Sequence, residues 1–537
     1  MKNILRRYPE LYLLLLGVAI ALGSLPYRSL FPFDDTFITF RYAANFAHGH
    51  GFVWNIGGPH TEGYTNFLFV VLLGACSFLN LDLVACSQII SILATLVTSI
   101  AIYQVVARLL KQYLNTDLLW PAFLASVLYL IDPFIWYNAW SGMETSLFAM
   151  FVVLCVRSLT MSTNYRSSFL LATCAALTRP EGALMGVIIL FVVFIRERES
   201  RAKIIMSFGT SFVLPLTLYA TWKYFYFGWL LPNSFYVKVG QPQLGHGTPM
   251  HGLAGVASYL KALFYIPLLA LFVFLRPRSD NAARFPIAVW ASLLWGFLLI
   301  VFYLFPEPMQ PNYDRFLVTI GIVLLIPTSL GVYKLSLRMK STLARTALIV
   351  LVIAFHLFSA VRIRNAHAYI TRDQTFDYRY EAIAEIFRTI PNHEQLTLAW
   401  GDAGKLPYYS GMKNIDVVGL NTNSIAHASN ADEVLALIAH ERPEIMIVPT
   451  ETRNANATDS CAQIIRWGHG LIGHSYPRLA TYSGLADYKA IVLIPQSVYD
   501  LVILCDTRSS QFGNIEKQLT SLIGRNPIVQ LPPKCFK

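Results

Sequence analysis

The chain has 537 residues and a net charge of +11 at pH 7, and 55% of its residues are hydrophobic while only 14% are charged. Soluble domains carry about 25% charged residues, so this composition excludes a chain built of several soluble domains, and the mean hydropathy of +0.49 agrees. Long apolar runs recur through the first two thirds of the sequence. They predict a polytopic α-helical membrane protein, because lipid admits only helices or closed barrels and the alternating pattern of a barrel is absent from these runs.

The positive charge has a membrane explanation. In a soluble protein it would suggest nucleic acid, but here most lysines and arginines cluster in short loops between apolar runs. That is the positive-inside pattern, so no nucleic-acid partner is expected. The basic start MKNILRR precedes an uncleaved first span over residues 9–27, which predicts a cytoplasmic N-terminus. The next segment, residues 28–80 (the first loop), is then expected outside.

The remaining apolar runs give the predicted helix count. Residues 66–80 are short for a crossing, which needs about 20 residues, so we interpret them as an interfacial or re-entrant helix. Further spans are predicted near residues 84–107, 118–133, 145–161, 167–178, 182–195, 203–226, 256–275, 285–305, 316–333 and 346–361. With the first span they make about 11 transmembrane helices, and this register places the basic loops in the cytoplasm. Residues 1–365 are therefore predicted to form a transmembrane domain.

The last third of the chain has a different pattern. Segments 396–400, 415–419, 444–448 and 490–494 are typical of strands, and the segment 431–440 between them is typical of a helix. Residues 366–537 therefore predict a soluble α/β domain, which lies outside after an odd number of spans. Whether Cys461 and Cys505 form a disulfide is left open.

Two adjacent carboxylates in the first loop, Asp34 and Asp35, are the strongest candidates for catalysis. A surface pair is most often a solvated helix cap, and a helix does begin here by pattern. Beside a membrane, however, neighbouring carboxylates can separate their pKa values, so that one becomes the base for an acceptor hydroxyl. They can equally hold a divalent cation such as Mg, Mn or Ca through oxygen ligands.

Basic residues are scarce in the loops expected outside, and four of them share motifs with aromatic, proline or asparagine residues. These candidates for gripping a phosphate are Arg41, Arg179, Lys238 and Arg315. The plainer alternative is an ion pair with Glu181 for Arg179 and with Asp314 for Arg315. Side chains suited to binding a sugar in the same loops are Tyr42, His60, Glu62, Tyr64, Asn66, Glu144, Glu181 and Asn233. For Tyr42 and Tyr64 the alternative is an aromatic belt at the membrane surface.

Nucleotide chemistry is not expected. No P-loop, dinucleotide fingerprint or hydrolase motif occurs in a credible context. The polar motifs gather on the external face, where nucleotides are not supplied. A lipid-linked donor suits this face, because its phosphate lies at the interface beside the arginines.

The motifs resemble those of a known family. The run DDTFITFRYAANFAHGHGFVWNIGGPHTEGYTNFL resembles the first external loop of GT-C type, polyprenyl-phosphate-dependent glycosyltransferases, closest to the terminal β-(1→2) arabinofuranosyltransferase and pilin arabinosyltransferase branch. The segments SGMET, LTRPEG, LPNSFYVK and YDRFL resemble its later motifs in the same order, and GDAGKLPYYSGMKNIDVVGLN resembles the signature of its external domain. The paired acidic motif of the family falls on Asp34 and Asp35.

The resemblance implies a GT-C fold and a decaprenyl- or undecaprenyl-phosphoryl sugar donor, with D-arabinofuranose as the expected sugar. The implied acceptor is a glycan or a pilin-like protein at the periplasmic face of a bacterial inner membrane. Two alternatives stay open: the same fold using mannose or another pentose or aminopentose, and a flippase or transporter of lipid-linked sugars. A transporter places ionisable residues near the bilayer midplane, whereas here they gather at one face, so a glycosyltransferase is predicted.

Overall fold

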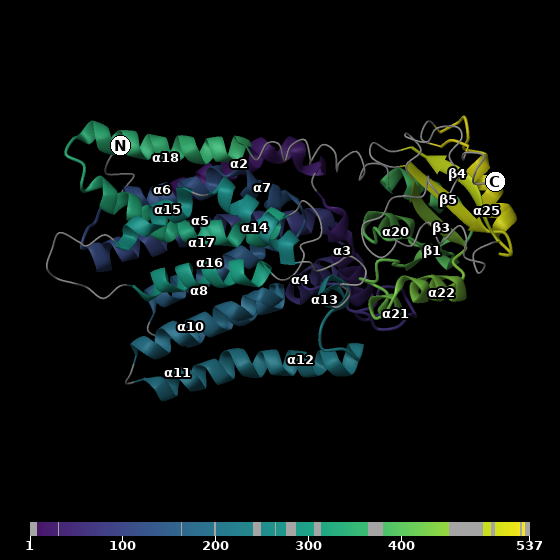
Figure 1. The fold of residues 1–537 in the computed structure, drawn as a ribbon, viewed down its shortest axis with the longest axis horizontal. Coiled ribbons are helices and arrows are strands. Elements are labelled where there is room, and N and C mark those ends of the chain that lie inside the picture. Colours follow the sequence, from purple (N-terminus) through teal and green to yellow (C-terminus); the bar gives the residue numbers. More distant parts are fainter. Residues whose placement is uncertain are drawn as a thin grey trace.

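The computed structural model describes residues 8–30, 32–162, 164–197, 200–239, 249–263, 265–274, 286–304, 313–362, 380–450, 487–495, 500–526 and 529–531 of the chain. A bundle of helices fills one end of the molecule, and a small domain with a sheet fills the other (Figure 1). The short helices α3 (Asp34–Ala47), α4 (Phe67–Phe78) and α13 (Asn233–Val239) lie where the two meet. The site described below is at this junction.

The bundle follows the predicted spans, which coincide with helices or with pairs of helices in the part of the chain that the structure describes. Its elements are α2 (Pro9–Ser24), η1 (Leu25–Leu30), α5 (Leu83–Leu114), α6 (Trp120–Ile131), α7 (Pro133–Trp140), α8 (Thr145–Met161), α9 (Arg166–Thr178), η2 (Pro180–Gly182), α10 (Ala183–Arg196), α11 (Arg201–Phe208), η3 (Gly209–Val213), α12 (Leu214–Phe227), α14 (Pro249–Ala262), α15 (Tyr265–Leu271), η5 (Phe272–Phe274), α16 (Ile287–Tyr303), α17 (Tyr313–Ser336) and α18 (Thr342–Arg362). The segment predicted as a short interfacial helix is α4.

Four described helices are long and apolar enough to cross a membrane: Leu83–Leu114, Arg201–Phe227, Arg315–Ser336 and Thr342–Ser359. The number rises to six if each of two bent pairs is one span, and the pair α6–α7 bends by 52° at the start of α7, where Pro133 cannot continue the hydrogen bonding of α6. Four further apolar helices, α2, α4, α8 and α16, are shorter. The predicted total of about 11 spans stays a prediction.

The bundle has a buried centre and an apolar outside. The apolar window of α17 is 94% buried, whereas the windows of Arg201–Phe227 and Thr342–Ser359 are each only 17% buried. Their outward side chains include Phe225 and Leu343, which are 82% and 80% exposed. Soluble proteins rarely leave such surfaces uncovered, and lipid covers them in a membrane protein.

The C-terminal unit, called the tail domain below, confirms the predicted α/β class. Its mixed sheet has the order β2-β1-β3-β5-β4, in which β2, β1 and β3 are parallel and β5 is antiparallel to both β3 and β4. The strands are β1 (Thr397–Ala399), β2 (Lys413–Ile415), β3 (Ile445–Thr450), β4 (Tyr488–Ile494) and β5 (Asp500–Asp506). The helices are η6 (His393–Gln395), α20 (Lys405–Ser410), α21 (Asn423–Ala426), α22 (Ala431–Glu441) and α25 (Phe512–Thr520).

One predicted strand is wrong. The segment 415–419 is not a strand beyond Ile415, where β2 ends. The chain turns there because the buried carboxylate of Asp416 accepts hydrogen bonds from the backbone N–H groups of Val418 and Gly419. Strand β5, an apolar run that was not predicted, lies between β3 and β4 in the sheet.

Two other predictions fall on residues outside those described. The predicted domain boundary after residue 365 lies in the gap between 362 and 380. Cys505 is a buried free thiol in β5, so it forms no disulfide with Cys461, which lies outside the described residues.

Aromatic packing holds the first loop against the tail domain. On α3, Phe37 and Phe40 are three residues apart and face the same side, so both are fully buried. The ring of Phe37 packs against Tyr408 and Tyr409 of the tail domain, with centroids 5.3 and 5.1 Å away. These contacts fix the orientation of α3, which begins with Asp34 and Asp35.

Candidate functional site

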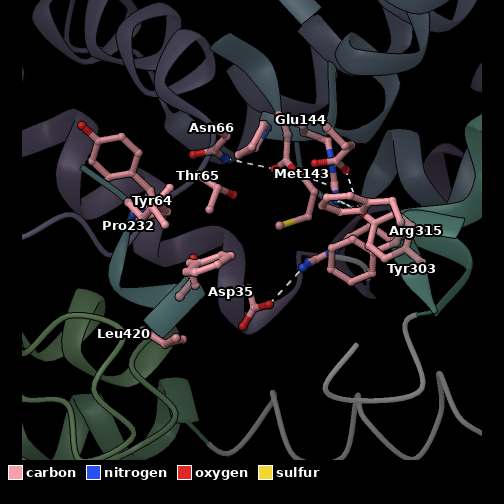
Figure 2. Close-up of a pocket in the computed structure, with 18 of the residues that line it drawn as sticks. Asp35, Tyr64, Thr65, Asn66, Met143, Glu144, Pro232, Tyr303, Arg315 and Leu420 are labelled. Carbon is pink, nitrogen blue, oxygen red and sulfur yellow. Dashed lines mark hydrogen bonds and ion pairs between the residues drawn. The ribbon is translucent and has the colours of Figure 1, made fainter. Parts of the chain in front are cut away.

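A cavity of about 600 Å³ opens at the junction of bundle, first loop and tail domain. Its walls come from α3, the segment 63–66, the turn before α8, η2, α13, α16 and α17, and from one residue of the tail domain, Leu420 (Figure 2). Segments far apart in the sequence thus converge here. Seven predicted site residues line it: Asp35, Tyr64, Asn66, Glu144, Arg179, Glu181 and Arg315.

A buried arginine forms the inner end of the cavity. Arg179 is 4% exposed, and its Nη1 lies 2.9 Å from Glu144 Oε1 while its Nε lies 2.6 Å from Glu181 Oε1. The phenol of Tyr303 accepts a hydrogen bond from Arg179 Nη2 at 3.3 Å and donates one to Glu181 Oε1 at 2.6 Å. A buried charge needs such partners, because desolvation is otherwise costly. The predicted pair with Glu181 is confirmed.

The local sequence explains where Arg179 stands. Pro180 disfavours helical backbone at the residue before it, and Arg179 accordingly has extended dihedrals, φ −153° and ψ 136°, and ends α9. The short η2 turn then carries Glu181 back beside the same guanidinium. The LTRPEG motif thus builds the inner end of the cavity.

Glu144 joins this cluster to the first loop. Its Oε2 accepts a hydrogen bond from Asn66 Nδ2 at 3.0 Å, and the same amide donates to Thr39 Oγ1 at 3.0 Å. The SGMET turn that presents Glu144 requires a glycine, because Gly142 has a φ of +77° and a Cβ there would lie 2.8 Å from Thr36 Cγ2. Three helices, α3, α8 and α9, are tied together through these groups.

The mouth of the cavity carries Asp35 and Arg315. Arg315 Nη1 lies 3.4 Å from Asp35 Oδ2, and the two side chains are 10% and 45% exposed. Arg315 Nε is buried and has no hydrogen-bond partner among the described residues. The guanidinium lies 4.6 Å from the ring centroid of Phe316. This contact with the ring positions the guanidinium and leaves its N–H groups able to donate hydrogen bonds. Figure 2 shows the pair pointing toward one another across the opening.

Asp34 points elsewhere, so only Asp35 of the two predicted catalytic carboxylates lines the cavity. Its Oδ2 accepts from the backbone N–H of Gly404 at 3.0 Å and its Oδ1 from that of Lys405 at 2.7 Å. Both carboxylate oxygens thus bind the tail domain at the start of α20. A Cβ on Gly404 would overlap the Asp34 backbone, so this approach also requires glycine.

Arg41, another predicted phosphate ligand, also binds the tail domain and does not line the cavity. Its Nη1 donates to Pro407 O at 2.8 Å and its Nη2 to Met412 O at 2.9 Å. Its Nε donates to Trp54 O at 2.8 Å, and the guanidinium lies 4.5 Å from the Trp54 ring centroid. The donors of this arginine are therefore engaged away from the cavity.

Four residues predicted to bind a sugar lie outside the cavity lining. Tyr42 is buried, and its hydroxyl accepts a hydrogen bond from the backbone N–H of Gly63 at 3.1 Å. His60 is exposed and stacks on Tyr226 with centroids 4.0 Å apart. Asn233 donates to Asn423 Oδ1 of the tail domain at 2.9 Å.

Glu62 is the fourth, and its environment is unusual. It is 4% exposed and its Oε2 lies 2.7 Å from Lys223 Nζ on α12. Burial raises the pKa of Glu62 to about 7, and the pair with Lys223 opposes that shift. Glu62 thus fastens the first loop to α12. The side chains of Lys238 and Asp314 are outside the described residues.

The carboxylates do not fit a shared divalent cation. Both Asp34 oxygens accept backbone N–H groups, and Asp35 faces a guanidinium. Among the described residues, no group of three or more His, Cys, Asp or Glu side chains has a metal-binding arrangement. Oxygen ligands in larger number are what Mg²⁺ and Ca²⁺ require.

Sequence reasoning missed several residues of the cavity, among them Tyr303, Phe316 and Leu420. Tyr303 is the last residue of the apolar helix α16, where a tyrosine is indistinguishable from a belt residue. Leu420 lies within a segment predicted as part of a distant domain. For Tyr303, the polar hydroxyl at the end of an apolar helix was the one sequence signal that indicated a role in the site.

Comparison with solved structures identifies the fold. Two crystal structures of ArnT from Cupriavidus metallidurans match, one bound to undecaprenyl phosphate and one in the apo state. Each is 11% identical in sequence; the TM-scores are 0.57 and 0.56, and the matches cover 92% and 94% of this chain and 98% of ArnT.

Residues 368–507 match a family model described as "Domain of unknown function (DUF8728)". No curated protein matches the chain. The chain has the ArnT fold, which confirms the predicted architecture: a set of apolar helices with a small C-terminal sheet domain.

Proposed function

We propose that the protein is a membrane glycosyltransferase that moves a sugar from a polyprenyl-phosphate donor to an acceptor hydroxyl. The observation that carries this proposal is the cavity in which a half-exposed carboxylate, Asp35, faces the guanidinium of Arg315, which has an N–H without a partner among the described residues. One of the two ArnT structures with this fold is bound to undecaprenyl phosphate, which supports a lipid phosphate as a ligand.

Arg315 is the proposed ligand of the donor phosphate. Arg179 has two carboxylate partners, so its charge is balanced inside the protein. Within the described part of the chain, Arg315 has one carboxylate partner at 3.4 Å and a buried Nε without a hydrogen-bond partner. An orphaned buried donor beside a cavity is explained by a ligand, and guanidinium forms strong paired hydrogen bonds with phosphate oxygens. Lys238 is also proposed to bind the donor phosphate, and only its sequence motif supports that role.

Asp35 is the proposed general base. It takes the proton of the acceptor hydroxyl while the oxygen forms a bond to the anomeric carbon of the sugar. The bond from that carbon to the phosphate oxygen breaks, and its electron pair leaves with polyprenyl phosphate. Arg315 stabilises the negative charge on the leaving phosphate, since a positioned cation is most effective where charge develops.

The proposed sugar is D-arabinofuranose, on the strength of the motifs in the first loop. Mannose and another pentose or aminopentose are the alternatives. Asn66, Glu144 and Tyr64 line the cavity and offer polar groups for sugar hydroxyls; the Tyr64 hydroxyl is buried without a partner among the described residues. The proposed acceptor is a periplasmic glycan or pilin-like protein. The proposed location is the bacterial inner membrane, with the N-terminus in the cytoplasm and the tail domain in the periplasm.

One assay tests the proposal directly. Purified protein is incubated with synthetic undecaprenyl-phosphoryl arabinofuranose, mannose or aminoarabinose, and the release of undecaprenyl phosphate is measured. Release that depends on one of these sugars supports the proposal. Binding of undecaprenyl phosphate with no release from any donor contradicts it and favours a carrier of lipid-linked sugars.

The same assay with EDTA tests whether the positive charge at the donor phosphate comes from Arg315 or from a divalent cation. We expect turnover to stay within about twofold of the untreated rate, because Arg315 supplies the positive charge that a cation would otherwise provide at the phosphate. The control is a protein sample treated with EDTA and then supplied with excess Mg²⁺. A loss that Mg²⁺ restores would show that Asp35 serves a metal.

Arg315→Ala is expected to raise the donor KM by about 10- to 100-fold, since a hydrogen bond to a charged group contributes about 1.5–3 kcal/mol. Arg315→Lys should recover only part of this loss, because an ammonium lacks the planar fork. Steady-state kinetics against donor concentration measure the change. The matched control is Arg345→Ala on the exposed start of α18. An unchanged donor KM in Arg315→Ala would place the phosphate elsewhere.

A further inference from the structure

A loop of the tail domain, residues 416–421 (the 416–421 loop), is built around a buried carboxylate. Asp416 Oδ1 accepts from the backbone N–H groups of Val418 at 2.9 Å and Gly419 at 3.2 Å. Its Oδ2 accepts from the backbone N–H of Asn421 at 2.9 Å and from its side-chain amide at 3.0 Å. Gly419 has a φ of +97°, a conformation that favours glycine. Four hydrogen bonds to one fully buried carboxylate make the loop rigid.

The loop is seated on the first loop and on α13. A Cβ on Gly63 would overlap Asn421 Oδ1 and lie 2.8 Å from Leu420 O, so backbone meets backbone here. Just beyond the loop, the amide of Asn423 donates to His60 O at 3.1 Å and its Oδ1 accepts from Asn233 at 2.9 Å. Asp34 and Arg41 bind the same domain at α20 and before β2. The tail domain is therefore fixed against the cavity at several points.

This seating places Leu420 in the wall of the cavity. Leu420 is half-buried, and the same lining includes the apolar side chains of Leu231, Pro232 and Phe235. As viewed in Figure 2, Asp35 is drawn between Leu420 on one side and Arg315 on the other. The proposed base, the proposed phosphate ligand and Leu420 thus line one cavity.

We propose that the 416–421 loop is the acceptor-side wall of the site and that Leu420 is a specificity-determining residue for the acceptor. This rests on the proposed function. The donor lipid reaches the cavity from the bundle, whereas the loop belongs to the domain at the opposite end of the molecule. An acceptor hydroxyl must approach Asp35 from the face away from the leaving phosphate, and Leu420 borders that face. The domain of unknown function is then part of the substrate site.

The test separates acceptor from donor in one set of kinetics. Leu420→Ala is assayed with undecaprenyl-phosphoryl arabinofuranose as donor and octyl arabinofuranoside as acceptor probe. We expect the acceptor KM to rise by about 10-fold or more, the discrimination that a methylene-sized change gives in an apolar pocket. The donor KM should rise less than the acceptor KM, because Leu420 is proposed to border the acceptor side of the cavity.

Further variants guard against a purely structural effect. Leu420→Met conserves volume and should stay within about twofold of wild type, and Leu531→Ala, an exposed leucine of the same domain, should do the same. Gly63→Ala displaces the loop and should repeat the rise in acceptor KM. A Leu420→Ala protein with unchanged acceptor KM, or with a raised donor KM instead, overturns this inference alone. A wild-type protein that turns over no lipid-linked sugar overturns it together with the proposed function.

Discussion

Asp35→Asn is expected to lower kcat for sugar transfer by at least about 100-fold, because a positioned general base contributes about 10²- to 10⁴-fold. The amide keeps the shape of the side chain and an oxygen for Arg315, so folding and membrane insertion should be preserved. Purified variant and wild type are compared at equal amounts in the release assay. Thermal unfolding of both proteins verifies that the loss is chemical.

Asp34→Asn is the matched control, since the two residues are neighbours with different contacts. Its effect should fall on the docking of the tail domain, because one of the two backbone N–H groups bound by Asp34 would face an amide N–H. A buried polar group left unpaired costs about 1–3 kcal/mol. We therefore expect a lower unfolding temperature and faster proteolysis between bundle and tail domain, with kcat reduced less than in Asp35→Asn. Equal loss of kcat in two equally stable variants would mean that the pair acts as one catalytic unit.

The different contacts of the two aspartates could be predicted in part from the sequence. Successive residues of an α-helix point about 100° apart, which favours different partners for two adjacent carboxylates in the first turn of α3. The helix start near Asp34 was predicted, although the N-cap of α3 is Phe33, which makes no side-chain capping hydrogen bond. What was not accessible is the partner: Gly404 is 370 positions away, and no local pattern reports that distance.

The same distinction holds for the rest of the site. Motifs whose partners are local were predictable: Arg179 and Glu181 are two residues apart, and Pro180 between them dictates the turn. Arg41 looked like a phosphate ligand because its character is generic, and its engagement with Pro407, 366 positions away, is a tertiary contact. Charge type indicates what a residue can bind, while the fold decides what it meets.

The tail domain shows how a local pattern can also mislead. The apolar run after Ile415 has strong strand propensity, yet the buried carboxylate of Asp416 turns the chain by collecting its own backbone N–H groups. Aspartate competes with sheet hydrogen bonding in this way. The glycine three residues later, with its positive φ, was the signal for a turn. That turn brings Leu420 to the cavity, so the error concealed a residue of the site.

Arg179→Leu is expected to lower the free energy of unfolding by about 3–5 kcal/mol, since removing one partner of a buried ion pair leaves uncompensated charge. Here two carboxylates, Glu144 and Glu181, lose their shared guanidinium at 2.9 and 2.6 Å. Denaturant unfolding of the detergent-solubilised protein measures the loss, and Arg345→Ala on the exposed start of α18 is the control.

The triple variant Arg179→Leu, Glu144→Gln, Glu181→Gln separates charge balance from catalysis. Neutral amides beside an apolar side chain carry no buried charge, and replacing a whole buried ionic cluster is often neutral for stability. Stability should therefore recover in large part. Transfer should not, because Glu144 and Glu181 line the cavity and their carboxylates are the acceptors that hold Arg179 and Tyr303 in place. If the triple variant regains both stability and sugar transfer, the cluster of Arg179, Glu144 and Glu181 serves only packing. If it regains stability alone, the cluster is needed for the shape and charge of the sugar site.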